Sequence, residues 1–153
     1  PRHYIHHPSL DIVYFSNEQG CSVTAYRLDP GTGALSSQQT ISTLPADFTG
    51  KSYCADVKIT PNGKFLYGTN RGHDSVAVYS IAADGRLTLV AIEPSGGKGP
   101  QNLAITPDGQ FLLCANMPGK NVVTFRIDPT SGRLTAVGKP VEMPSPSCIM
   151  LLP

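Results

Sequence analysis

The sequence lacks tryptophan, long apolar runs and any strong excess of charge. Charged residues make up only 15% of its 153 residues, with a formal net charge of +1. A general nucleic-acid-binding protein would usually carry a basic patch or stripe. No apolar stretch approaches the roughly 20 residues that a membrane-spanning helix needs, and the given residues do not open with a positively charged, apolar leader. We therefore expect no nucleic-acid or membrane partner and a cytoplasmic location.

Cysteines are also few, and they lie far apart. None belongs to a C-x-x-C pair, so the spacing matches neither a dense disulfide framework nor a zinc site. Reduced thiols packed in a cytosolic protein are the favoured interpretation, with a disulfide as the alternative. The four residues are Cys21, Cys54, Cys114 and Cys148.

An internal repeat organises the chain. Residues 59–70 (ITPNGKFLYGTN) return as residues 105–116 (ITPDGQFLLCAN), and residues 6–17 are a looser copy. The longer first spacing places an insertion at residues 45–53. Successive repeat prolines are 53, 46 and 46 residues apart, at Pro8, Pro61, Pro107 and Pro153.

Each repeat predicts four short strands. In the second copy these are residues 56–60, 65–69, 75–81 and 87–92, with turns at 61–63 and 84–85. No long 3.6-residue periodicity occurs, so helices should be nearly absent. Units of about 40–50 residues with four strands are typical of β-propeller blades. A β-sandwich or barrel is the competitor, but neither requires one turn to recur at a fixed spacing.

The predicted fold class is therefore all-β, a partial β-propeller of four-stranded antiparallel blades. The blades cover residues 1–50, 54–98 and 100–144, and residues 146–153 would form the inner strand of a closing blade. Closed propellers usually have four to eight blades. We expect the chain to be part of a larger ring, its missing N-terminal blades supplied by the same original polypeptide or by a second chain.

One mouth of the central channel collects the polar residues. In a blade the first strand is innermost, so its start and the end of the antiparallel second strand meet at one rim. The first two repeats place six charged or titratable residues there, and the third places Gln101, Asn102 and Met117. The alternative to a functional site is that these residues are ordinary solvated charges on surface loops. The six are Arg2, His3, Glu18, Asp56, Arg71 and His73.

Other polar residues receive structural interpretations. Asn17, Asn70 and Asn116 recur in every complete copy, which favours capping of the corner backbone over catalysis. His6 would point away from His3 and His7 on a strand, so these three cannot converge on a metal. No phosphate-binding glycine loop or G-x-S-x-G elbow is present. We expect neither a metal nor another cofactor.

Residues 1–3 (PRH), 16–18 (SNE), 54–63 and 69–76 resemble the β-propeller 6-phosphogluconolactonase family. The resemblance spans the whole chain and implies the C-terminal half of a seven-bladed ring. It also implies metal-free hydrolysis of a small anionic sugar lactone, 6-phosphogluconolactone, to 6-phosphogluconate in the pentose phosphate pathway of carbohydrate metabolism. Related propellers include carboxymuconate cyclases, whose proposed site uses arginines and a glutamate on this rim.

By position, Arg2, Glu18 and Arg71 match those motifs, whereas a further histidine of the relatives belongs to an upstream blade. The resulting hypothesis assigns His3, Glu18 and Arg71 to catalysis, with Glu18 or His3 as general base. Arg2, Asp56 and His73 are assigned to substrate binding, with Asp56 and His73 as second-rank candidates that would orient the catalytic groups. Two alternatives stay open, a lactonase or lactonising enzyme for another acid such as carboxymuconate, and a non-catalytic binding propeller.

Overall fold

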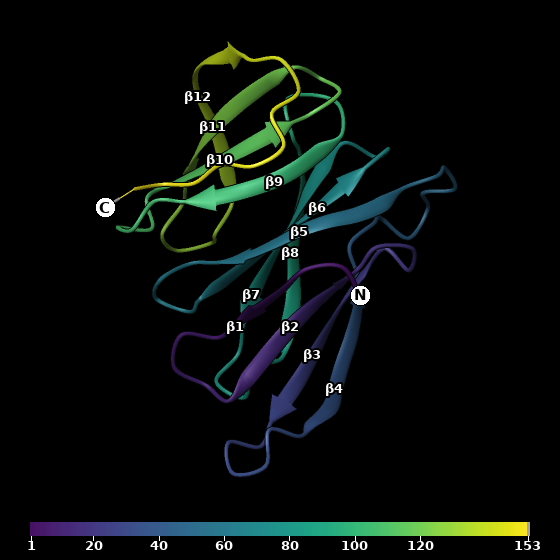
Figure 1. The fold of residues 1–153 in the computed structure, drawn as a ribbon, viewed down its shortest axis with the longest axis vertical. Helices are drawn as coiled ribbons and strands as arrows, with labels where there is room; N and C mark the ends of the chain where they lie inside the picture. Colours follow the sequence, from purple (N-terminus) through teal and green to yellow (C-terminus); the bar gives the residue numbers. More distant parts are fainter. Residues whose placement is uncertain (153) are drawn as a thin grey trace.

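A computed structural model describes residues 1–152, and within them the chain is all-β. Its strands form three separate four-stranded antiparallel sheets that fan out one after another, as Figure 1 shows. This arrangement confirms the predicted partial propeller. Because the described residues hold no helix, they hold none that could cross a membrane.

Every sheet follows chain order, so each is one blade with its first strand at one edge. The first blade contains β1 (Tyr4–His6), β2 (Ile12–Asn17), β3 (Ser22–Leu28) and β4 (Leu35–Ser42). The second contains β5 (Tyr53–Ile59), β6 (Phe65–Arg71), β7 (Ser75–Ile81) and β8 (Leu87–Pro94). The third contains β9 (Pro100–Ile105), β10 (Phe111–Asn116), β11 (Asn121–Ile127) and β12 (Leu134–Glu142).

The predicted strands of the second blade match the observed ones closely, and β7 has the predicted bounds. The main difference is that β5 begins at Tyr53 rather than at residue 56, because Tyr53 and Cys54 already pair with the end of β6. The register then shifts between Cys54 and Val57, which marks a bulge at Asp56 on the predicted rim.

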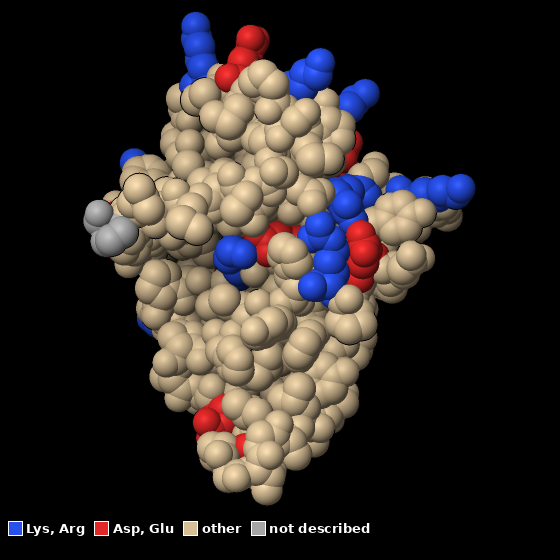
Figure 2. All heavy atoms as spheres, in the orientation of Figure 1, with Lys and Arg blue, Asp and Glu red and all other residues tan. Residues whose placement is uncertain are grey.

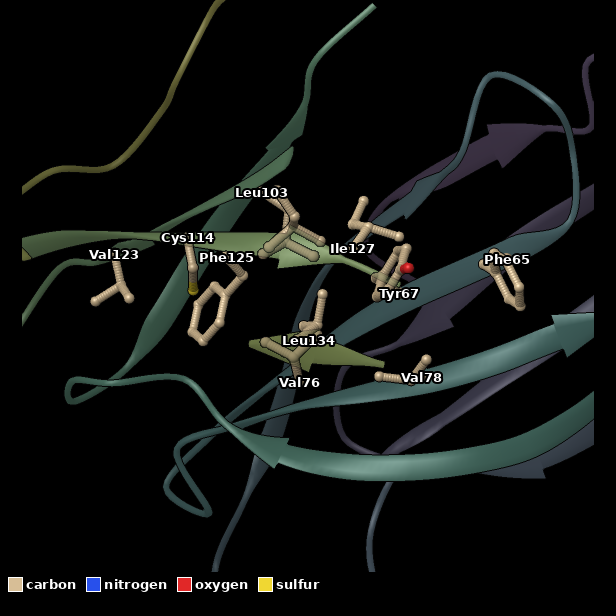
Figure 3. Packing of buried hydrophobic residues seen from close by; sticks show 11 residues of the cluster. Phe65, Tyr67, Val76, Val78, Leu103, Cys114, Val123, Phe125, Ile127 and Leu134 are labelled. Carbon is tan, nitrogen blue, oxygen red and sulfur yellow. The ribbon is translucent and has the colours of Figure 1, made fainter. Parts of the chain in front are cut away.

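Alternating side chains of the middle blade fill two separate cores. On β6, Tyr67 packs in the core shared with the third blade, whereas Leu66 packs in the core shared with the first. Val78 and Tyr79 divide in the same way on β7, as the period of two in a strand requires. Figure 3 shows the core between the second and third blades.

Tyrosine hydroxyls join neighbouring blades. Tyr14 donates a hydrogen bond to the Gly85 carbonyl at 2.8 Å, and Tyr67, its repeat equivalent, donates to the Gly132 carbonyl at 2.8 Å. Gly132 has φ of +75° and sits against the Phe65 ring, where a Cβ would overlap the ring. The turn must therefore be glycine for the blades to pack this closely.

The recurring asparagines are structural, but their partners differ from the prediction. Asn70 Nδ2 donates to the Thr43 carbonyl at 2.7 Å and to Ser75 Oγ at 3.1 Å. Asn116 Nδ2 similarly donates to the Ser95 carbonyl at 3.1 Å. These bonds tie the corner to the preceding loop and the next strand rather than capping the corner's own backbone.

The predicted inner strand over residues 146–153 stays a prediction, because the strands that would pair with it belong to blades outside this chain. Residues 143–152 belong to no strand, and Pro153 lies outside the described residues. A strand requires a hydrogen-bonded neighbour, and among the described residues this segment is held instead by the Met143 N–H on the Lys120 carbonyl at 3.0 Å and the Ile149 N–H on Asn102 Oδ1 at 2.7 Å.

Candidate active site

The predicted rim exists, and its charges gather there. The chain before β1, the end of β2, β5 and the end of β6 meet at one end of the inner strands. Figure 2 shows basic and acidic side chains close together in the middle of this face, over β5. The repeat therefore brings together residues that are more than 50 positions apart in the sequence.

Glu18 is held between two arginines. Its Oε1 atom lies 3.5 Å from Arg2 Nε and also accepts a short hydrogen bond from Arg71 Nη2. All three side chains are partly exposed. The structure thus joins the three residues that the resemblance selected into one cationic cluster with a single carboxylate.

Backbone carbonyls and an amide fix the two guanidinium groups. Arg2 Nη1 donates to the Ala55 carbonyl at 3.1 Å, and Arg71 Nη1 donates to Gln101 Oε1 at 3.4 Å. Arg71 Nε is buried but finds no hydrogen-bond partner within residues 1–152. Each guanidinium is nevertheless held by a group of the next blade.

Asp56 is the buried centre of a second group of contacts. Its side chain is 0% exposed, and its two oxygens accept hydrogen bonds from all sides. The structure therefore gives Asp56 a positioning role and no free oxygen for substrate. The donors are His3 Nδ1 at 2.7 Å, Lys58 Nζ at 2.8 and 2.9 Å, Asn102 Nδ2 at 2.7 Å, and the N–H groups of Val57 and Leu103 at 2.9 Å.

These partners keep the buried carboxyl ionised. Burial alone would raise the pKa of Asp56, but the Lys58 ammonium and the hydrogen bonds from Leu103, Lys58 and His3 outweigh burial and lower that pKa below its usual value. Asp56 is therefore a fixed negative charge beneath His3.

The contacts of His3 define its tautomer. Arginine can only donate hydrogen bonds, and Arg2 Nη1 lies 3.2 Å from His3 Nε2, so Nε2 is the acceptor. The other ring nitrogen, Nδ1, then carries the proton and donates it to Asp56. His3, whose side chain is 41% exposed, thus presents an unprotonated nitrogen at the rim.

His73 lies apart from this group. Its Nδ1 atom is 2.7 Å from Ser75 Oγ, and its ring packs edge-on against Phe48 at 4.7 Å between centroids. No hydrogen bond among the described residues links His73 to Arg2, Glu18 or Arg71. Its contacts are those of a corner residue that supports the inserted segment 45–53.

The remaining histidines give no metal site. His7 accepts hydrogen bonds from the N–H groups of Ser9 and Leu10 and donates to the Gly63 carbonyl at 3.1 Å, so it holds a turn. Across residues 1–152, no group of three or more His, Cys, Asp or Glu side chains is arranged to hold a metal ion.

Sequence reasoning missed Lys58 and Lys51. Lys58 follows Asp56 by two positions on β5, so both side chains share one face of the strand, and that spacing was a usable signal. Lys51 lies in the insertion, where the repeat offers no template. The Lys51 backbone can lie this close only because residue 72 is glycine. Gly72 has φ of +102°, and a Cβ there would collide with the Lys51 carbonyl oxygen.

Comparison with known proteins settles the family. The family model described as lactonase, 7-bladed beta-propeller, matches residues 1–151. The chain belongs to this lactonase family. The predicted resemblance is confirmed, and seven is the blade number that describes the family.

Individual relatives agree with this assignment. The chain is 34% identical over 153 residues to a 6-phosphogluconolactonase of Bacillus subtilis (strain 168), covering 99% of this chain and 44% of that protein. It is 41% identical over 138 residues to a 6-phosphogluconolactonase of Formosa agariphila, a match that covers 88% of this chain and 38% of that protein. The chain thus spans less than half the length of either relative.

A solved structure shows the same fold in a lactonase that is named differently. The structure of a periplasmic gluconolactonase from Pseudomonas aeruginosa matches with a TM-score of 0.90 at 31% identity, covering 96% of this chain and 41% of that one. That name mentions no phosphate. The names of these relatives therefore cover both a phosphorylated and an unphosphorylated sugar lactone.

Proposed function

We propose that the full-length protein hydrolyses 6-phosphogluconolactone to 6-phosphogluconate, a step of the pentose phosphate pathway, and that this chain supplies the rim that performs it. The observation that carries the proposal is the arrangement of His3 over buried Asp56, beside Arg2 and Arg71. The names of relatives at 34% and 41% identity supply the reaction class. Further blades would complete the ring, in keeping with the share of those relatives that this chain covers.

His3 is the better candidate for the general base. Its Nε2 atom is unprotonated and can take a proton once its single hydrogen bond from Arg2 Nη1 opens, and Asp56 holds the opposite nitrogen, as in other enzymes that orient an imidazole through a buried carboxylate. Glu18 is already bound by two guanidinium groups through Oε1. Taking up a proton there would break both ion pairs.

The proposed reaction is a water attack on the lactone carbonyl. His3 Nε2 takes a proton from the water as its oxygen bonds to the carbonyl carbon, and Arg2 and Arg71 stabilise the negative charge that develops on the carbonyl oxygen. The ring C–O bond then breaks, and the His3 imidazolium returns the proton to the departing ring oxygen. One water is consumed, and a carboxylic acid and a hydroxyl result.

A lactone-hydrolysis assay of the full-length protein tests the proposal. Removing the Arg71 guanidinium with Arg71→Ala should lower kcat/KM by about 10²-fold or more, because one preorganised donor to a developing oxyanion contributes roughly that much. Arg86→Ala, at an exposed turn on the far side of the blade, is the matched control. Unchanged kinetics in Arg71→Ala would refute the assignment.

We place the protein in the cytoplasm as part of this proposal. The four cysteines are all unpaired, and burial raises the pKa of Cys54 to about 11 and that of Cys114 to about 12. Unpaired thiols suit a reducing compartment. Fractionation of cells tests the location, and recovery with periplasmic markers would contradict it.

A further inference from the structure

A pocket whose lining includes three basic residues lies beside Arg71. It has a volume of about 350 Å³ and sits where the corners of the second and third blades meet. Arg71 and Gln101, which are hydrogen bonded to each other, both line it. The other side chains that shape it are Lys51, Tyr53, Lys98 and Met117.

The fold holds the walls of this pocket in place. Asp74 Oδ1 accepts hydrogen bonds from the Gly72 N–H at 3.1 Å and the Gly99 N–H at 2.8 Å, which ties the β6–β7 corner to the loop carrying Lys98. The insertion brings Lys51 against Gly72 from the other side. Three separate segments therefore hold the backbone of two exposed lysines at the edge of one opening.

The charge of the lining favours an anion. Arg71, Lys51 and Lys98 are among the lining residues, and the one carboxylate in the lining is that of Asp74, one oxygen of which already accepts two backbone N–H groups. Lysine and arginine are the side chains that bind phosphate, through charge-assisted hydrogen bonds. Tyr53 and Met117 add apolar surface of the kind that packs against the carbon atoms of a sugar.

Arg71 lies between this pocket and the cluster of Arg2, Glu18 and His3 at the rim. One guanidinium nitrogen contacts Glu18, and another contacts Gln101 at the pocket wall. One side chain therefore borders both the proposed catalytic rim and the pocket. We infer that the pocket formed by Lys51, Lys98 and Arg71 binds the phosphate of the lactone and makes the enzyme selective for the phosphorylated substrate. This inference rests on the proposed lactonase function.

The test compares two substrates in the full-length protein. Wild type and the double variant Lys51→Met/Lys98→Met are assayed with 6-phosphogluconolactone and with unphosphorylated gluconolactone. We expect KM for the phosphorylated lactone to rise about tenfold or more, as the loss of charge-assisted bonds predicts. For unphosphorylated gluconolactone, kcat/KM should stay within about twofold, because catalysis at His3 is untouched. Lys64→Met, an exposed lysine of the 62–64 turn at the other end of β6, is the control for net charge.

The outcomes separate this inference from the proposed function. An unchanged KM for the phosphorylated lactone, or an equal loss with both substrates, would overturn the phosphate pocket while leaving the lactonase intact. If wild type hydrolyses neither lactone, the proposed function fails, and calorimetry with 6-phosphogluconate and gluconate still decides the pocket. Preference for the phosphorylated acid in wild type, lost in the double variant, supports it; equal binding of both acids overturns it.

Discussion

His3 Nδ1 lies 2.7 Å from Asp56 Oδ1, and the two residues occupy the same position of successive repeats. Asn102, the equivalent residue of the third repeat, extends the contact by donating to Asp56 Oδ2 at 2.7 Å. A series of hydrogen bonds thus crosses three blades around the channel. Solvated loop charges do not explain it, because the central carboxylate is fully buried.

The buried carboxylate makes stability depend on pH in a defined direction. Because folding lowers the pKa of Asp56, its stabilisation is complete above the ordinary carboxyl pKa of about 4 and is lost as pH falls through the lower pKa of the folded protein. Asp56→Asn should be destabilised by at least about 2 kcal/mol at pH 7, since it leaves Lys58 without its counter-ion. The Tm difference from wild type should then shrink below about pH 4. Asp84→Asn, at an exposed turn, is the control, and a pH-independent difference for Asp56→Asn would contradict the account.

Gly72 should tolerate no side chain. Gly72→Ala combines a positive φ with a collision against the Lys51 carbonyl, whereas Gly33→Ala has φ of +74° with nothing within 4 Å. We expect the Gly33 variant to lose about 1 kcal/mol of unfolding free energy from backbone strain alone, and the Gly72 variant to lose clearly more. Urea unfolding measures both. Equal losses would show that the Lys51 segment moves freely away.

The tyrosine hydroxyls between blades should be individually measurable. Tyr67→Phe deletes the donor to the Gly132 carbonyl and leaves that acceptor buried, which should cost about 1–2 kcal/mol. Tyr14→Phe should behave alike because it breaks the equivalent bond to Gly85. Tyr53→Phe, whose side chain is exposed, serves as the control in the same urea titration. A loss in the control as large as in Tyr67→Phe would refute the inter-blade role.

The sequence repeat predicts those features of the fold and of the site that depend only on the spacing of residues along the chain. Strand bounds such as 75–81 and the meeting of Arg2, Glu18 and Arg71 at one rim follow from it, because antiparallel strands return their ends to the same edge. The sequence also shows that His3 and Asp56 occupy the same position in successive repeats. Their direct hydrogen bond could not be predicted, because the spacing shows which face a side chain occupies but not how far it reaches.

Features between blades escaped prediction for a related reason. The Tyr14–Gly85 bond and the placement of Lys51 against Gly72 join segments whose packing is decided by side-chain volume across an interface. The sequence also places Asp56 at the rim without revealing that three blades bury it. Residues 146–152 match the repeat of an inner strand, yet no adjacent strand among the described residues pairs with them.

The turnover of His3 and Glu18 variants with 6-phosphogluconolactone in the full-length protein tests the central claim, that His3 is the base, most directly. His3→Gln should lower kcat by about 10²–10⁴-fold, because it removes the group that takes the proton from water. Glu18→Gln should lower kcat clearly less, and Tm values verify that both variants are folded. A His3→Gln enzyme that keeps the wild-type kcat, beside a Glu18→Gln enzyme that loses it, would contradict the account and transfer the base to Glu18.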